Sequence, residues 1–250
     1  MPLTLPTHPL AVAPLKLWRP RWFDGVGLTL GAIAPDLAYA ADGYGVTIHS
    51  HAWHAPLWWA VPLTLVLAPL VRWAAAPVAA HLPHGGPLAL RDYGVLSRST
   101  HRWWVTAWSA ALGAVTHILW DAVTHPTVDG GRVPFPPLTS EALAGRPWWL
   151  VISRLSDLIG FVLAAVLAVH IGRSRLLRRW HGAPVPVRRR PARFWATAIV
   201  VATAGAALLP LQPVRLFHDQ AVRTLLVVSI ALLAGAVAVS PNHRARLPVH

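Results

Sequence analysis

The stretch that decides the fold is A-V-T-H-I-L-W-D-A-V-T-H-P, residues 114–126. His117 and Asp121 stand four residues apart in it, so in a helix their side chains share one face, about 6 Å apart along the axis. The surrounding run over residues 103–123 is otherwise apolar and aromatic, and it is long enough to cross a bilayer. An ionisable pair in such a segment is costly unless it is used. The sequence therefore predicts a central span that presents two potential metal ligands on one face.

The composition of the chain indicates a membrane protein. Of its 250 residues, 55% are hydrophobic and only 12% are charged, whereas a soluble domain has about 25% charged residues. The formal net charge of +13 is also found in nucleic-acid-binding proteins, but a solvated basic face needs polar surroundings that this chain lacks. We therefore expect the charge to orient the protein in the membrane, and we expect no nucleic-acid partner. The chain has no cysteine, so a metal site must use His and carboxylate ligands.

Apolar segments separated by polar, Pro- and Gly-containing loops predict an all-α fold. We expect a polytopic helical membrane protein with five or six transmembrane helices and a short N-terminal helix. The segments of suitable length and character are residues 56–71, 103–123, 150–172, 194–211 and 221–240. The apolar pieces at residues 10–17 and 26–41 are short for a span.

The predicted organisation has three parts. Residues 1–172 form a helical membrane domain that carries the His/Asp site, residues 173–193 an Arg-rich cytoplasmic linker, and residues 194–240 a C-terminal pair of transmembrane helices. The start of the chain has no basic segment before its first apolar run, and four prolines interrupt it, so we expect no cleavable signal peptide there.

The positive-inside rule places the Arg-rich linker in the cytoplasm and orients the other spans. Most Lys and Arg residues then share that side, including Arg72, which is expected to snorkel at the end of its span, and Arg244 and Arg246. The residues left on the other side are Arg132, Arg146, Arg215 and Arg223. Asp36, a loop rich in His and the His117 end of the central span therefore meet on the extracytoplasmic face.

Imidazole and carboxylate groups from three segments are suitable ligands for zinc or another divalent ion. Water on such an ion is acidified and becomes a nucleophile for ester or phosphoester hydrolysis. In the His-rich loop we expect His51 and His54 to lie at the membrane interface rather than to bind metal. His125, eight residues after His117, is expected to serve as a further ligand or as a substrate contact.

Four short motifs resemble a family of bacterial membrane proteins, domain-of-unknown-function family 4184. They are T-H-P at residues 7–9, G-A-I-A-P-D at 31–36, H-S at 49–50 and T-H-I-L-W-D-A-V-T-H-P at 116–126. Their order is also similar to that in inner-membrane proteins described as LexA-binding metal-dependent hydrolases, and more distantly to the all-helical zinc phospholipase C and P1 nuclease group. The resemblance implies a metal-ligand set of His8, Asp36, His49, His117 and Asp121.

Two departures from the hydrolase pattern bear on the metal count. The H-R-G-x-T-H-S of that family is reduced here to T-I-H-S at residues 47–50, so its first His has no counterpart. Its P-D-x-D is P-D-L-A here, with Ala38 in place of the second acid. We therefore expect a single divalent metal, zinc before others, rather than a binuclear site.

The function expected from these features is a metal-dependent hydrolase in the bacterial inner membrane. Its site would face the extracytoplasmic side, and its substrate would be a lipid or lipid-linked phosphoester. The alternative is a non-catalytic polytopic protein, either an assembly scaffold or a transporter whose path is lined by Asp36, Asp121, Arg154 and Asp157. A transporter of this kind is expected to show inverted repeats, and the sequence shows no internal repeat.

Overall fold

The computed structural model of the chain describes residues 7–99, 101–125, 135–213 and 217–240. Its order of elements is α1 (His8–Trp18), α2 (Gly25–Leu37), η1 (Ala38–Ala41), η2 (Pro56–Ala60), α3 (Val61–His81), η3 (Leu90–Arg98), α4 (Trp103–Thr124), η4 (Pro136–Thr139), β1 (Glu141–Leu143), β2 (Arg146–Pro147), α5 (Trp148–Arg173), α6 (Leu176–His181), α7 (Pro191–Leu208), η5 (Leu209–Leu211) and α8 (Phe217–Val239). Helices dominate this part of the chain, and the one sheet described is the small hairpin β1–β2 before α5. The predicted all-α fold and the short N-terminal helix are confirmed.

Four helices in the described residues are long and apolar enough to cross a membrane: Pro56–His81, Trp148–Arg173, Pro191–Leu211 and Phe217–Val239. This confirms the membrane protein, but four is fewer than the five or six spans predicted from the sequence. Helix α4 has 22 residues and is not among the four. Its polar residues, which include the buried Thr106, Ser109 and His117, lower its mean hydropathy.

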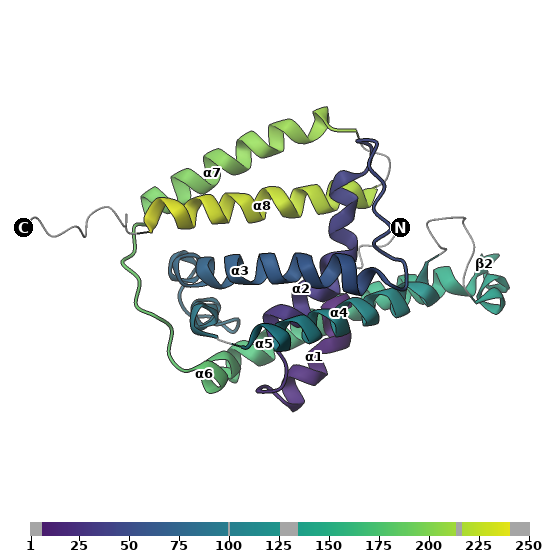
Figure 1. Ribbon diagram of the computed structural model, residues 1–250, viewed down its shortest axis with the longest axis horizontal. Coiled ribbons are helices and arrows are strands. Elements are labelled where there is room, and N and C mark those ends of the chain that lie inside the picture. The colour runs from purple at the N-terminus through teal and green to yellow at the C-terminus, as the bar shows by residue number, and fades with distance from the viewer. Residues whose placement is uncertain (1–6, 100, 126–134, 214–216, 241–250) are drawn as a thin grey trace, which may run out of the picture.

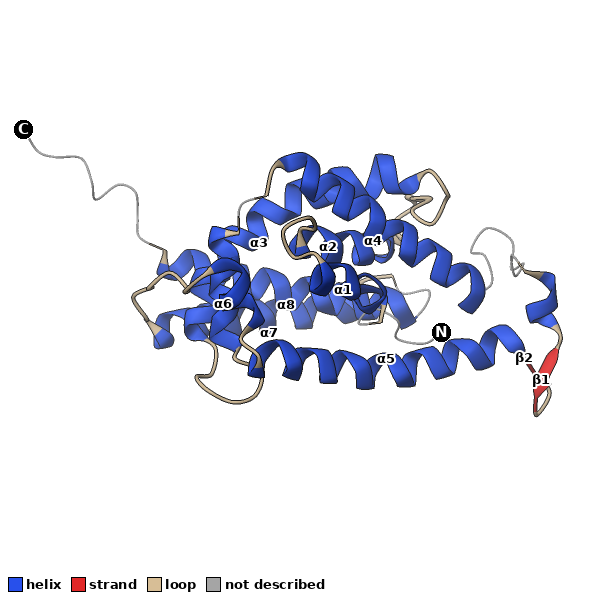
Figure 2. Cartoon of the chain, turned by 90° about the horizontal axis from the view of Figure 1, so that it is seen from below, coloured by secondary structure: helices blue, strands red, loops and turns tan. Residues whose placement is uncertain are grey.

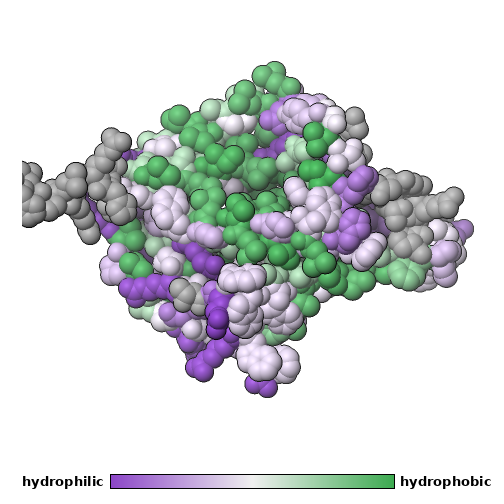
Figure 3. Space-filling view, in the orientation of Figure 1, coloured by the Kyte–Doolittle hydropathy of each residue, from purple (hydrophilic) through white to green (hydrophobic). Residues whose placement is uncertain are grey.

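Figure 1 shows α3, α8 and α7 arranged side by side, with α1 and α2 on the opposite side of α3 from α7. Helix α5 runs along the edge of the molecule and leads into the short α6 (Figure 2). Apolar side chains cover the face over α3, α7 and α8, whereas hydrophilic side chains gather around α6 (Figure 3). This distribution is the one expected for helices whose sides contact lipid.

Helices α2 and α4 pack with their backbones in direct contact. A Cβ atom added to Gly31 would overlap the carbonyl group of Ala110, and one added to Gly113 would overlap the carbonyl oxygen of Leu28. Small residues at a helix crossing permit this close approach, which is common between helices in membranes. The two glycines therefore set the separation between the helix that carries Asp36 and the helix that carries His117.

A buried polar network anchors the start of α2. The Asp24 carboxylate accepts hydrogen bonds from Val26 N, which caps α2, and from Thr106 Oγ1 at 2.6 Å, and it forms an ion pair with Arg72 of α3. The prediction that Arg72 snorkels at the end of its span stays a prediction, but its guanidinium is held by Asp24. Its positive charge balances the only carboxylate in this network, since an unpaired buried charge is strongly unfavourable.

The C-terminal helices α7 and α8 form a tightly packed pair beside α3. Gly205 faces the side chain of Val227, and Gly235 faces the ring of Phe194. Arg223 of α8 is buried and donates hydrogen bonds to the backbone carbonyls of Ala40, Asp42 and Pro213. The pair is thereby attached to the segment that follows α2. Arg132, Arg215, Arg244 and Arg246, which enter the topology prediction, lie outside the described residues.

Candidate metal centre

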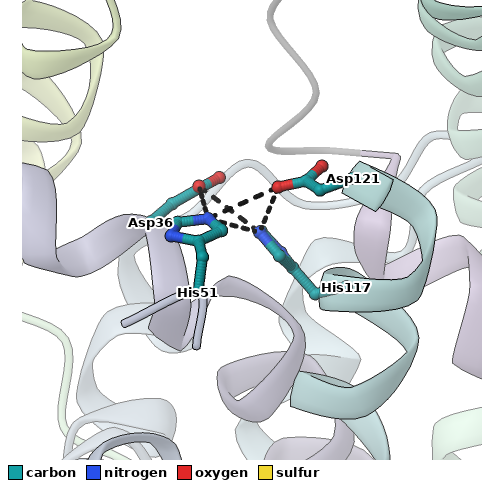
Figure 4. A group of neighbouring side chains, drawn as sticks. All are labelled: Asp36, His51, His117 and Asp121. Atoms are coloured by element: carbon teal, nitrogen blue, oxygen red, sulfur yellow. Dashed lines mark hydrogen bonds and ion pairs between the residues drawn. The ribbon is translucent and has the colours of Figure 1, made fainter. Parts of the chain in front are cut away.

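Four side chains from three parts of the chain converge between α2 and α4. Asp36 lies in the last turn of α2, His51 in the loop after η1, and His117 and Asp121 one turn apart on α4 (Figure 4). Each offers one ligand atom, and these atoms all lie within 4.8 Å of one another. The His-x-x-x-Asp spacing thus places both α4 side chains on one face, as helical periodicity requires.

The distances within this group, hereafter the four-ligand cluster, match the edges of a metal-centred tetrahedron. His117 Nε2 lies 3.1 Å from Asp121 Oδ2, 3.4 Å from Asp36 Oδ1 and 3.2 Å from His51 Nε2. His51 Nε2 lies 3.3 Å from Asp121 Oδ2 and 3.5 Å from Asp36 Oδ1. Ligands bound at about 2.0–2.1 Å in tetrahedral geometry are about 3.3–3.4 Å apart. The cluster can therefore hold a metal ion with little movement.

The outer nitrogen of each imidazole is held by a neighbouring group. His117 Nδ1 lies 2.7 Å from the backbone carbonyl oxygen of Ala32, which can only accept a hydrogen bond. The proton of neutral His117 is therefore on Nδ1, and the lone pair of Nε2 points into the cluster. His51 Nδ1 lies 3.1 Å from Ser50 Oγ, a hydroxyl that can either donate or accept this hydrogen bond. Such outer hydrogen bonds fix the tautomer and orientation of metal-binding histidines.

The cluster concentrates negative charge in a buried place. Two carboxylates face two imidazoles, and His117 is completely buried. Burial lowers the pKa of His51, but its hydrogen bonds to Asp121 and Asp36 outweigh burial and raise this pKa above the usual value. The two carboxylates thus favour a positive charge between them, which a divalent cation would supply. Metal binding to such sites releases protons.

The family model of DUF4184, a domain of unknown function, matches residues 1–241. The chain belongs to this family. The resemblance seen in the four motifs is thereby confirmed, whereas the similarity to the hydrolase groups stays a prediction. No curated protein and no solved structure matches the chain. The geometry of the site is therefore the main indication of what this DUF4184 protein does.

His8 and His125 form a second layer around Asp121. His8 is 1% exposed, its ring stacks on that of His117 at 3.6 Å between centroids, and its Nε2 lies 3.6 Å from Asp121 Oδ1. His125 Nδ1 lies 3.3 Å from the same oxygen. Both histidines thus contact the carboxylate oxygen that faces away from the four-ligand cluster. His8, which the resemblance places among the ligands, lies beside the cluster and not within it.

The His-rich loop contributes His51 to the cluster, and not the predicted His49. His49 is exposed and lies outside the cluster, whereas His51, which we expected to lie at the membrane interface rather than to bind metal, offers its Nε2 to the cluster. A tight turn separates the two, with Ser50 N donating to Ile48 O and Ala52 N donating to His49 O. A loop has no side-chain periodicity, so the sequence contains no signal that selects one of these histidines.

Paired substitutions in this loop test the assignment. We expect His51→Ala to lower zinc affinity by at least about 100-fold, because removing a ligand costs more than removing an outer-shell partner, which costs about 10–100-fold. The matched variant His49→Ala should bind zinc as the wild type does. Zinc titration of both purified proteins, monitored by calorimetry, measures the difference. A larger loss for His49→Ala would contradict the assignment.

A second group of ligand-type side chains lies at the start of α8. Asp42, His218 and Asp219 offer ligand atoms within 4.8 Å of one another. The ring of Tyr39 lies between the two groups, 4.0 Å from the ring of His218 and 5.5 Å from that of His51. Sequence analysis missed this group because Asp42 and His218 are far apart in the chain.

Proposed function

We propose that this DUF4184 protein is a membrane-embedded, metal-dependent hydrolase of a lipid or lipid-linked phosphoester. The metal is zinc, and the site faces the extracytoplasmic side of the bacterial inner membrane. The observation that carries the proposal is the near-tetrahedral set of His51 Nε2, His117 Nε2, Asp36 Oδ1 and Asp121 Oδ2. Two imidazoles and two carboxylates suit zinc, although other first-row divalent ions prefer similar ligands.

Because four protein ligands fill a tetrahedral site, a divalent ion in the cluster would bind water only as a fifth ligand or in place of one carboxylate. It would then supply an acidified water molecule and a Lewis acid for a phosphoester oxygen. The protein residues supply charge balance and hold the ligands in position. Asp36 and Asp121 balance the cation with two negative charges, and the Ala32 carbonyl fixes the orientation of His117. His8 Nε2 and His125 Nδ1 lie 3.6 Å and 3.3 Å from the remaining oxygen of Asp121. Such preorganisation keeps a site ready for reaction without reorganisation.

The position of the cluster favours a substrate from the membrane surface. Asp36 and His51 lie next to the loop that leads into α3, where Trp53 is 85% exposed and Trp58 is also exposed. Tryptophans are enriched at the level of lipid headgroups. The exposed tryptophans beside the cluster support a position at headgroup depth, where a phosphoester of a lipid is available. The distribution of Arg residues supports the extracytoplasmic orientation.

A hydrolysis assay tests the proposal. We expect zinc-loaded wild-type protein to hydrolyse bis(p-nitrophenyl) phosphate and phospholipids in mixed micelles, and a chelator to abolish the reaction. Asp36→Asn should lower turnover by at least about 100-fold, since a neutral amide oxygen replaces a negatively charged ligand. His49→Ala, a variant of an exposed residue outside the cluster, should retain full turnover.

The contrary outcome is equally specific. Wild-type protein that carries one equivalent of zinc and hydrolyses neither substrate would show that the cluster serves a structural or transport role. The transporter and scaffold alternatives would then be tested by metal uptake into proteoliposomes and by isolation of stable complexes.

A further inference from the structure

A cavity of about 420 Å³ lies along α1, from Pro9 to Leu17, and its other walls come mainly from α2, η3, α5 and α6. Its volume falls within the range of about 300–1,000 Å³ typical of small-molecule sites. Apolar side chains of three helices form most of its wall, among them Leu10, Ala13, Leu28, Leu167, Ala168 and Ile171. A surface of this kind favours an apolar occupant.

The two charged side chains that line the cavity are satisfied within the protein. Lys16 Nζ donates hydrogen bonds to the carbonyls of Pro20 at 2.7 Å and Phe23 at 2.8 Å, and it lies 5.4 Å from the ring centroid of Trp180. Asp24 is paired with Arg72. Neither side chain needs a ligand as a partner. The occupant that fits this wall is therefore a hydrocarbon chain.

The cavity is bordered by a helix that contacts lipid. Helix α5 is one of the four apolar helices long enough to cross a membrane, and it exposes Leu163 and Val166. It meets the start of α1 closely at Gly160, where an added Cβ would overlap the Thr7 side chain. From there α5 continues to the α6 end, where Ala164, Leu167 and Ile171 line the cavity. An acyl chain in the membrane can therefore reach the cavity alongside α5.

Positive charge gathers where the cavity reaches α6. Arg19 and Arg21 are exposed just after Leu17, which lines the cavity. Arg179 is exposed next to Trp180, another lining residue, and its neighbour Arg178 is paired with Asp92 at 2.6 Å. Basic residues close to a membrane surface attract anionic lipid headgroups. This end of the cavity is suited to a negatively charged phosphate.

We propose that the cavity binds one acyl chain of an anionic phospholipid, whose phosphate lies beside Arg19 and Arg179. The site is separate from the four-ligand cluster, so it holds whether or not the chain is a hydrolase. The lipid fills the space between α1 and α5 and supports the helix that carries His8.

Native mass spectrometry of the detergent-solubilised full chain tests the proposal. We expect one molecule of phosphatidylglycerol to remain bound under activation that removes phosphatidylcholine with identical chains. Ala168→Phe fills the cavity and should lower the bound fraction at least fivefold. The matched variant Ala165→Phe places the same ring on the exposed side of α5 and should leave binding unchanged. Equal retention of phosphatidylglycerol by the two variants would overturn the proposal.

The headgroup contact has its own control. The double variant Arg19→Gln and Arg179→Gln should reduce retention of phosphatidylglycerol to that of phosphatidylcholine, whereas Arg188→Gln with Arg189→Gln, in the exposed linker, should not. Equal effects of the two pairs would show a general charge effect and no site.

A measurement on the wild type does not depend on variant folding. Phosphatidylglycerol with a diazirine in one acyl chain should label the lining residues Ala13, Ala164, Leu167, Ala168 and Ile171. Labelling confined to the exposed face of α5, at Leu163 and Val166, would overturn the proposal. Asp36→Asn should label as the wild type does, so failure of the hydrolase proposal and failure of this one are distinguishable.

Discussion

His117→Ala is expected to abolish metal binding by the purified protein. The wild type, purified without chelators and reloaded with zinc, should carry about one equivalent, as a four-ligand site implies. His117 contributes a buried Nε2 that lies 3.1–3.4 Å from the other three ligand atoms. Its loss removes one of the two imidazoles that contact every other member of the cluster and leaves His51 alone between Asp36 and Asp121. Elemental mass spectrometry should then find zinc near background.

Two controls separate loss of the ligand from loss of the fold. Thr116→Ala changes the neighbouring position on α4, where the hydroxyl donates only to the carbonyl of Gly113 at 2.8 Å, and it should keep its zinc. Asp121→Ala should lose zinc as His117→Ala does. Both ligand variants should elute as the wild type does in size-exclusion chromatography and show the same helical circular dichroism. A folded His117→Ala protein that retains stoichiometric zinc would refute the metal centre.

The sequence predicts best the ligands whose relative positions follow from helical periodicity. His117 and Asp121 share a helix, so their spacing alone places them on one face. Asp36 could be added because it closes an apolar helix at the same predicted end. His8 entered the predicted ligand set only from a motif of the family resemblance. In the structure it lies beside the cluster. These residues illustrate how local rules identify ligands on helices.

The remaining features depend on tertiary contacts that no local rule contains. The choice of His51 over His49 follows from a single tight turn in a loop. Arg72 pairs with Asp24 across 48 residues of sequence, so charge counting assigned it to the membrane surface. Helix α4 was expected to span the membrane because it is long and apolar, although several of its polar residues are buried against its neighbours. Each of these three features depends on a polar residue whose neighbours in the structure are distant in sequence.

Gly113→Leu is expected to lower both the stability of the protein and its affinity for zinc. A Cβ at this position would overlap the backbone of α2 at Leu28 and Ala32, which cannot move as a side-chain end can. Overpacking in a core costs about 1–3 kcal/mol, and the overlap with backbone places this variant at the upper end. For a chain of this size about 3 kcal/mol corresponds to a decrease in Tm of roughly 6–12 °C.

The same substitution should weaken zinc binding, because α2 carries Asp36 and the Ala32 carbonyl that orients His117. Gly113→Ala, which adds the Cβ alone, should show a smaller decrease in both Tm and zinc affinity. Val115→Phe adds bulk at an exposed position of the same helix and should change neither. Differential scanning fluorimetry and zinc titration on the three variants measure both quantities. If Gly113→Leu lowered Tm but left zinc affinity intact, contact between α2 and α4 would stabilise the fold without setting the geometry of the cluster.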